Sequence, residues 1–149
     1  MKENYQQAKL ELIKKLPDIK DFEERIKLVV DVLKEHIEKY HWVGIYMKDN
    51  EELLLHYYVG LPTIHIRIPI SEGICGAAVR ERQTVVVDDV LKDPRYIACS
   101  LGTRSEIVVP IYKGDDIVGE IDIDSDIPSA FTEGDKEFLE NIAIWIVEQ

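Results

Sequence analysis

Cysteines and long apolar runs are scarce in this chain of 149 residues. It has two cysteines, Cys75 and Cys99, so the disulfide framework that staples many small secreted domains is not expected. A transient or catalytic bridge between two thiols remains compatible with this count. No apolar stretch approaches the roughly 20 residues that cross a bilayer, and the first residues lack the apolar core of a signal peptide. We therefore expect a cytosolic protein without membrane association, folded as a single domain over residues 1–149.

An excess of positive charge, nucleotide-binding motifs and metal-binding motifs are lacking as well. The formal net charge is −11 at pH 7, which disfavours nucleic acid and anionic lipid as partners and favours a zwitterion or a cationic group. The glycines form neither a Walker loop nor a Gly-x-Gly-x-x-Gly fingerprint. The four histidines show no ligand spacing with one another or with the cysteines. The sequence thus predicts no metal and no other cofactor.

The hydrophobic period changes from helical to extended about a quarter of the way along the chain. Apolar residues recur at helical spacing over residues 3–16 and 21–40, and strand-like patterns begin after His41. Extended segments are expected at residues 42–47, 53–59, 64–70, 84–87, 106–112 and 117–124, and helices at 73–82 and at 132–147, where Thr132 is the cap. This order indicates an α+β domain with an antiparallel sheet and helices mainly on one face. The other face is then free for a pocket under the irregular residues 88–104.

Both cysteines lie where a thiol can react. Cys99 falls in the irregular segment, where polar neighbours can favour the thiolate. Cys75 follows Gly73 at the expected start of a helix, a position at which the helix dipole and unpaired N–H groups lower the pKa of a thiol. The alternative for Cys99 is that it is a small buried apolar residue. The residue type alone favours this alternative.

Carboxylates alternate with isoleucines along the last expected strand. Glu120, Asp122 and Asp124 share one face, and Glu106 on the partner strand can join them. On the pattern alone, the favoured interpretation is the solvated face of an antiparallel sheet. Like charges side by side repel one another, however, so such a cluster can also hold a cation or a shared proton.

Four motifs follow one another along the chain, namely GICGAA at residues 73–78, IAC at 97–99, SEIVVP at 105–110 and IDIDS at 121–125, with Phe131 after them. Together they resemble the free methionine-(R)-sulfoxide reductases, which are single-domain enzymes of the GAF fold. The resemblance implies an antiparallel sheet of about six strands, with the N-terminal and C-terminal helices packed mainly on one face. It also implies a closed pocket for a free amino acid and a homodimer built through the helices.

In the implied reaction, the thiolate of Cys99 attacks the sulfoxide sulfur while a carboxylic acid protonates the oxygen. Cys99 is left as a sulfenic acid, which condenses with Cys75 to a disulfide that thioredoxin or a similar dithiol reduces. The chain departs from the family at His65, where many members carry a third cysteine. It also has Tyr96 and Ser100 where the family tends to have His and Asp around its Ile-Ala-Cys motif, which affects the tuning of the nucleophile's pKa.

The other matched residues surround the substrate in the family. The resemblance implies that Glu106, Asp122 and Asp124 bind the ammonium group of the substrate and help to protonate its sulfoxide oxygen. It implies that Trp42 and Tyr46 surround the methyl group of the substrate. Two other functions remain open. The first is a GAF module that senses a small molecule without catalysis. The second is a thiol sensor in which Cys75 and Cys99 oxidise reversibly.

Overall fold

A six-stranded antiparallel sheet forms the centre of the protein, in a computed structural model that describes residues 3–97 and 102–148. The strand order is β3-β2-β1-β6-β5-β4. The strands are β1 (Trp42–Asp49), β2 (Glu52–Val59), β3 (Arg67–Pro69), β4 (Val85–Val87), β5 (Ser105–Lys113) and β6 (Asp116–Ser125). The helices are α1 (Tyr5–Lys15), α2 (Phe22–His36), α3 (Gly73–Glu81) and α4 (Glu133–Trp145), with short 3-10 turns η1 (Leu16–Asp18) and η2 (Val90–Lys92). The expected α+β class and antiparallel sheet are confirmed.

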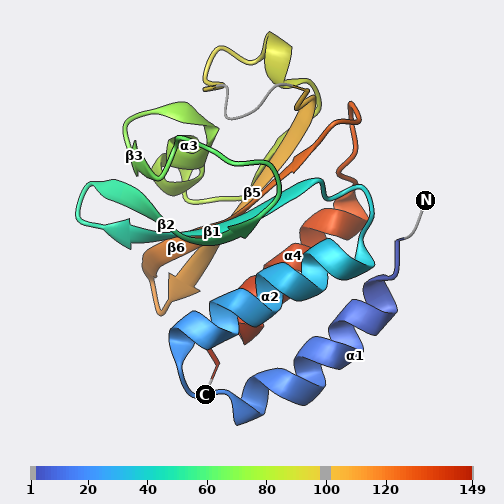
Figure 1. Cartoon of the computed structure of the whole chain (residues 1–149). Helices are drawn as coiled ribbons and strands as arrows, with labels where there is room; N and C mark the ends of the chain where they lie inside the picture. The colour runs from blue at the N-terminus through green and yellow to red at the C-terminus, as the bar shows by residue number, and fades with distance from the viewer. Residues whose placement is uncertain (1–2, 98–101, 149) are drawn as a thin grey trace.

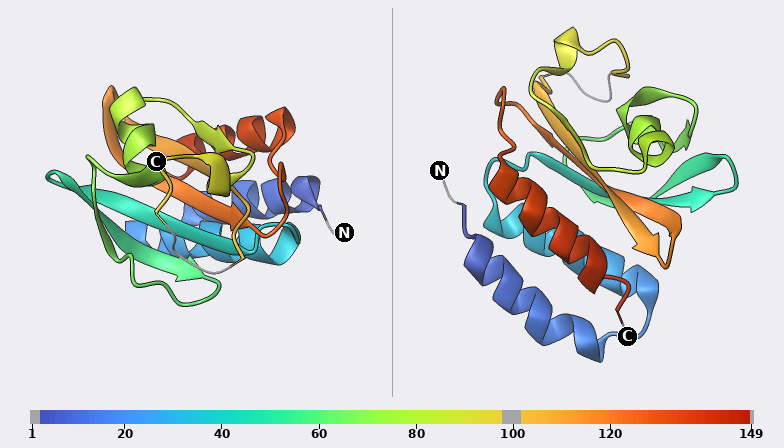
Figure 2. Two further views of the ribbon diagram at one scale, coloured as in Figure 1. Left: turned by 90° about the horizontal axis from the view of Figure 1, so that it is seen from above. Right: turned by 180° about the vertical axis from the view of Figure 1, so that it is seen from behind.

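Three helices gather on one face of the sheet (Figure 1). Helices α2 and α4 lie against the sheet, and α1 packs beside α2, as the view from behind shows (Figure 2). Apolar side chains that alternate along the central strands fill the space between sheet and helices. These strand residues are Val43, Ile45, Ile107, Val109, Ile121 and Ile123. Among the described residues, no helix has the length and apolar character needed to cross a membrane.

Capping side chains define where α2 and α4 begin. The side chain of Thr132, the cap that the sequence predicted for α4, accepts a hydrogen bond from the backbone N–H of Asp135. The side chain of Asp135 accepts one from the backbone N–H of Thr132, which completes a capping box. Helix α2 ends at His36, four residues before the predicted end. Ile37 has extended backbone angles and pairs with Glu3, yet it remains fully buried. The helical spacing of apolar residues, from which this helix was predicted, therefore continues beyond the end of α2.

Helix α3 lies on the opposite face of the sheet from α1, α2 and α4 (Figure 1). It forms a second apolar cluster with side chains of β1, β3, β4 and β5, separate from the core under the long helices. Gly76 allows α3 to approach this closely, because a Cβ atom there would overlap the carbonyl group of Ile70. The face that the sequence left free for a pocket is thus partly covered by α3.

Candidate active site

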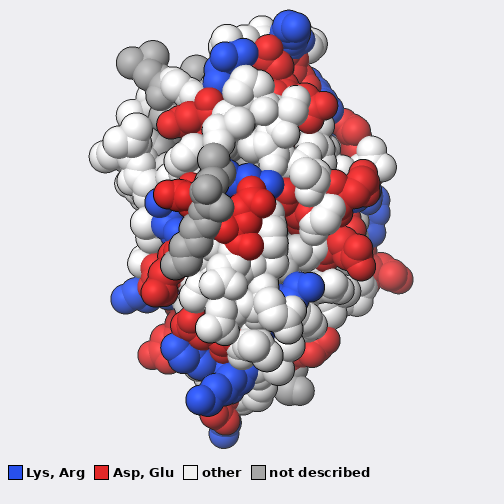
Figure 3. Space-filling model, turned by 90° about the vertical axis from the view of Figure 1, so that its right-hand side faces the viewer, with Lys and Arg blue, Asp and Glu red and all other residues white. Residues whose placement is uncertain are grey.

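The carboxylates predicted to share a face do so. Strand pairing places Glu106 of β5 opposite Asp124 of β6, and Glu120 and Asp122 follow at alternate positions of β6. Acidic groups are spread over the molecular surface shown in Figure 3, as the net charge leads one to expect. These four are not among the solvated ones, since the exposed fractions are 4% for Glu106, 0% for Glu120, 1% for Asp122 and 4% for Asp124. The interpretation of this face as solvated is wrong, because α3 and the segments around it exclude water.

Burial and crowding change the protonation of this acid cluster, defined as Glu106, Glu120, Asp122 and Asp124. Burial, followed by the charge of Asp122, raises the pKa of Glu120 and also that of Asp124 well above the ordinary range. Burial raises the pKa of Asp122 too, although hydrogen bonding to Glu106 and Cys75 opposes that effect. Such acids retain protons at a pH at which exposed carboxylates are ionised. The cluster can therefore supply a proton as well as negative charge.

Cys75 lies directly against the acid cluster. Its side chain is 5% exposed, and its Sγ donates a hydrogen bond to Oδ2 of Asp122 over 3.4 Å. Burial, followed by the charges of Asp122 and its neighbours, raises the pKa of the Cys75 thiol well above the ordinary range. The expected lowering of this pKa by the start of α3 is wrong. A helix terminus contributes only about 0.3–1 kcal/mol, less than one pKa unit, and the buried acids outweigh it.

Two aromatic side chains line the same face beside the acids. Strand β1 pairs with β6 so that Trp42 is opposite Asp124 and Tyr46 is opposite Glu120. Trp42 stacks on Tyr58 with ring centroids 5.4 Å apart, and its Nε1 donates to the carbonyl of Leu61 over 3.1 Å.

The hydroxyl of Tyr46 donates to the carbonyl of His65 over 2.7 Å. Gly44 lies between the two aromatic residues, and a Cβ there would lie 2.6 Å from Cζ3 of Trp42. Glycine at position 44 therefore allows the indole to lie flat along the strand, next to the acids.

A small cavity opens between these groups and α3. Its volume is about 20 Å³, room for roughly one water molecule, and its lining residues are His65, Ile68, Gly73, Ile74, Cys75, Ile97 and Glu106. Ile97 is the last described residue before Cys99, which lies outside the described residues together with Ala98, Ser100 and Leu101. The structure thus brings together Trp42, Tyr46, Cys75, Glu106, Asp122 and Asp124.

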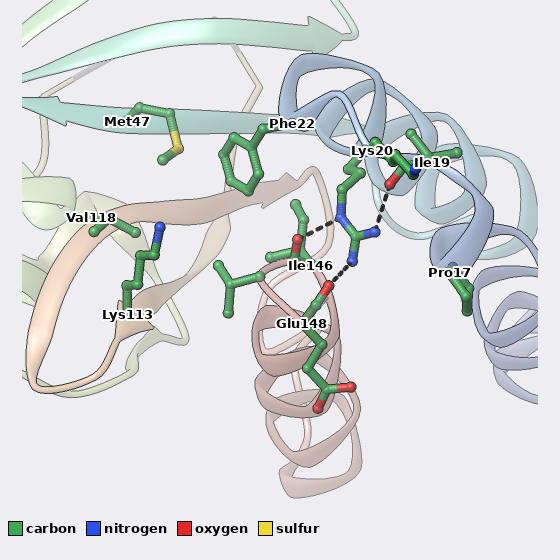
Figure 4. A pocket seen from close by; sticks show the side chains of 11 residues that line it. Pro17, Ile19, Lys20, Phe22, Met47, Lys113, Val118, Ile146 and Glu148 are labelled. Atoms are coloured by element: carbon green, nitrogen blue, oxygen red, sulfur yellow. Dashed lines mark hydrogen bonds between the residues drawn. The ribbon is translucent and has the colours of Figure 1, made fainter.

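A larger cavity, of about 620 Å³, lies on the other face of the sheet and is lined by Phe22, Met47, Lys113, Val118 and others (Figure 4). Arg25 forms part of its wall, and its N–H groups donate to the backbone carbonyls of Leu16, Ile19, Trp145, Ile146 and Glu148. This arginine ties the end of α4 to η1 and has no donor left for a ligand. The cavity has no cysteine and no cluster of buried acids in its lining, so the candidate chemistry is on the α3 face.

Relatives place the chain among known proteins. The sequence model of the GAF domain family matches residues 21–148 of the chain. The chain belongs to the GAF domain family. It is 43% identical over 115 residues to GAF domain-containing protein A of Dictyostelium discoideum, covering 76% of this chain and 72% of that one. It is 33% identical over 111 residues to the free methionine-R-sulfoxide reductase of Escherichia coli, covering 74% of this chain and 67% of the relative.

A solved structure supports the same relationship. The reduced form of the fRMsr of Staphylococcus aureus superposes on this GAF domain with a TM-score of 0.91 at 38% identity, covering 97% of this chain and 93% of the other. The resemblance to free methionine-R-sulfoxide reductases that the motifs indicate is thereby confirmed. Glu120 is the one member of the acid cluster to which that resemblance assigned no role. Its place in the alternation with Asp122 and Asp124 is the signal that could have included it.

Proposed function

We propose that this protein is an oxidoreductase that reduces free methionine-(R)-sulfoxide to methionine with thiols as the source of electrons. The observation that carries the proposal is the buried acid cluster beside Trp42 and Tyr46, in a chain related to enzymes of that name. A free amino acid brings an ammonium group that needs negative charge. A sulfoxide oxygen needs a proton before it can leave sulfur. One buried cluster with raised pKa values meets both needs.

Binding begins with the charge of the substrate. Glu106, Asp122 and Asp124 are proposed to hold the ammonium, since a buried carboxylate is stabilised by a cation that replaces its lost water. Trp42 and Tyr46 are proposed to enclose the methylsulfinyl end, because their faces are apolar and lie beside the acids. The backbone carbonyls of Leu61 and His65 fix both aromatic groups, which favours one substrate orientation.

Cys99 is the proposed nucleophile. Its sulfur attacks the sulfoxide sulfur, the S–O bond to methionine breaks as the oxygen passes to Cys99, and methionine leaves. The proton lost from the Cys99 thiol is returned, through a carboxyl group, to that oxygen. The products are methionine and a Cys99 sulfenic acid, so no atom or electron is unaccounted for.

Cys75 is the proposed resolving thiol. It condenses with the sulfenic acid, water leaves, and a disulfide remains. The hydrogen bond from Sγ to Asp122 Oδ2 gives the thiol proton an acceptor, which the raised pKa of Cys75 requires. Thioredoxin or a similar dithiol then reduces the bridge. Because Cys75 is buried, the incoming thiol is expected to attack the sulfur of Cys99.

Two properties complete the proposal. Free thiols that cycle through a disulfide need a reducing compartment, such as the cytosol. A homodimer through the helices is supported by Leu10 and Ile13 of α1, which expose 52% and 56% of their surface one helical turn apart. A purely redox-sensing role is less well supported, because sensor thiols are accessible and have low pKa values, unlike Cys75.

The test uses the purified protein with free methionine-R-sulfoxide, thioredoxin, thioredoxin reductase and NADPH. Wild type is expected to turn over, and Cys99→Ser to be inactive. Cys75→Ser is expected to lose turnover with thioredoxin but to complete one round of methionine formation. The S epimer and peptide-bound methionine sulfoxide are expected to react poorly. Correctly folded wild type that releases no methionine, with either thioredoxin or a small dithiol, would contradict the proposed function.

A further inference from the structure

The acid cluster and Cys75 have a property that reduction of a sulfoxide does not require. Ligand atoms of Cys75, Glu106 and Asp122 all lie within 4.8 Å of one another, and all three residues are buried. One is a soft sulfur donor and two are carboxylate oxygens, a donor set that suits Zn²⁺ or Cd²⁺ better than Mg²⁺ or Ca²⁺. In tetrahedral coordination by zinc, a sulfur and an oxygen ligand are about 3.6 Å apart, given the usual bond lengths. The 3.4 Å between Sγ of Cys75 and Oδ2 of Asp122 is close to this spacing.

Unpartnered oxygens around these three residues are the second observation. Glu120 is completely buried, and neither of its carboxyl oxygens has a hydrogen-bond partner among the described residues. Oδ1 of Asp122 is buried without a partner as well. Glu120 and Asp122 stand at alternate positions of β6, so their side chains share the face on which Cys75 contacts Asp122. Buried polar atoms are normally satisfied, and an unsatisfied set on one site indicates a missing ligand.

The charge balance favours a divalent ion. The described ion pairs include none of Glu120, Asp122 and Asp124. The ammonium of an amino acid brings a single positive charge to this group, whereas a divalent cation brings two and displaces the thiol proton.

We propose that Cys75, Glu106 and Asp122 bind a thiophilic divalent cation such as Zn²⁺, with Glu120 beside it, and that the bound ion blocks entry of the substrate. The blocking step rests on the reductase function proposed above, whereas the binding step does not. The ion would occupy the carboxylates that receive the ammonium and would hold the sulfur of Cys75 away from disulfide formation.

Binding is tested in Cys99→Ser, in which Cys75 is the only thiol of the chain. Titration with Cd²⁺ is expected to produce a sulfur-to-cadmium charge-transfer band that saturates at one ion per chain and that Zn²⁺ abolishes by competition. Asp122→Asn and, separately, Glu106→Gln are expected to weaken Cd²⁺ binding at least tenfold, with folding checked by circular dichroism. A second cluster of Glu11, Glu35 and His36 on the opposite side can also attract metal. Glu11→Gln is therefore the matched control and is expected to leave the band unchanged.

Inhibition is tested with the wild-type protein in single turnovers of the reduced enzyme, because a small dithiol would chelate the metal. Zn²⁺ is expected to raise at least tenfold the methionine-sulfoxide concentration that gives half the maximal rate, and EDTA to restore it. Absence of the charge-transfer band, or a band that persists when either carboxylate is replaced in a folded variant, would overturn the metal site. Saturation with Zn²⁺ that leaves turnover unchanged would overturn the block. A wild type without turnover contradicts the reductase function and leaves the binding result to stand alone.

Discussion

Replacing Glu120 by glutamine probes the electrostatic state of the acid cluster. The folded protein holds this carboxyl group away from water and without a hydrogen-bond partner among the described residues. Burial and the charge of Asp122 raise its pKa well above the ordinary 4.5, whereas the unfolded chain leaves it near that value. At intermediate pH the folded state therefore binds one proton more than the unfolded state, and raising the pH favours unfolding.

The magnitude follows from this one proton. Below pH 4.5 both states are protonated and Glu120 has no effect on the pH dependence. Above it, each pH unit lowers the free energy of unfolding by about 1.4 kcal/mol until Glu120 ionises in the folded protein. Glutamine has nearly the same shape and no proton to lose. For each pH unit between the unfolded and the folded pKa, Glu120→Gln should gain about 1.4 kcal/mol relative to wild type, which is roughly 3–6 °C in Tm for a chain of this length.

Urea unfolding at a series of pH values from mildly acidic to neutral measures this difference, with EDTA present so that no metal offsets the charge. Glu51→Gln is the matched control, because the side chain of Glu51 is exposed. It is expected to follow the wild type at every pH. A stability difference between Glu120→Gln and wild type that stays constant over this range would show that Glu120 ionises equally in both states, and would refute the reasoning.

Three further changes test other parts of the structure. Arg25→Met leaves the carbonyls that this arginine satisfies unpaired, so urea unfolding should show a loss of about 3–5 kcal/mol. Gly76→Ala places a methyl group against the Ile70 carbonyl and should cost about 1–3 kcal/mol, whereas Gly134→Ala in α4 should be neutral or stabilising by up to about 1 kcal/mol, as compared by Tm. Asp124→Asn should raise the KM for methionine sulfoxide about 10–100-fold through the lost contact with the ammonium, and an unchanged KM in steady-state assays would remove Asp124 from the binding site.

Local patterns in the sequence predicted the elements well because each depends on near neighbours. The alternation of Glu120, Asp122 and Asp124 with isoleucines located β6 and its two faces. Thr132 and Asp135 located the start of α4. The end of α2 was predicted too late, because Ile37 is buried by its pairing with Glu3 and not by a helix.

Local patterns do not predict which element covers a face of the sheet. The sequence of a strand with one polar side has the same alternation whether that side faces water or packs against another element. Solvent exposure was therefore the favoured interpretation. Burial of the carboxylates depends on α3, and α3 can approach because Gly76 presents no side chain to Ile70. The pKa of Cys75 was also predicted wrongly because it depends on residues that are distant in the sequence. Its place at a helix start is visible in the sequence, but the acids that outweigh the helix dipole come from strands far along the chain.

The two faces of the sheet explain how the protein tolerates such a costly cluster. Four carboxylates in a dry space destabilise the folded state whenever they carry charge. The same β6 residues that alternate with them, Ile121 and Ile123, anchor the apolar core under α2 and α4 on the other side. Apolar packing on one face of β6 thus offsets the cost of the buried carboxylates on the other face, and the residues responsible alternate along the same strand. A ligand with positive charge removes part of that electrostatic cost when it binds, so the cluster favours a cationic ligand before any particular contact is made.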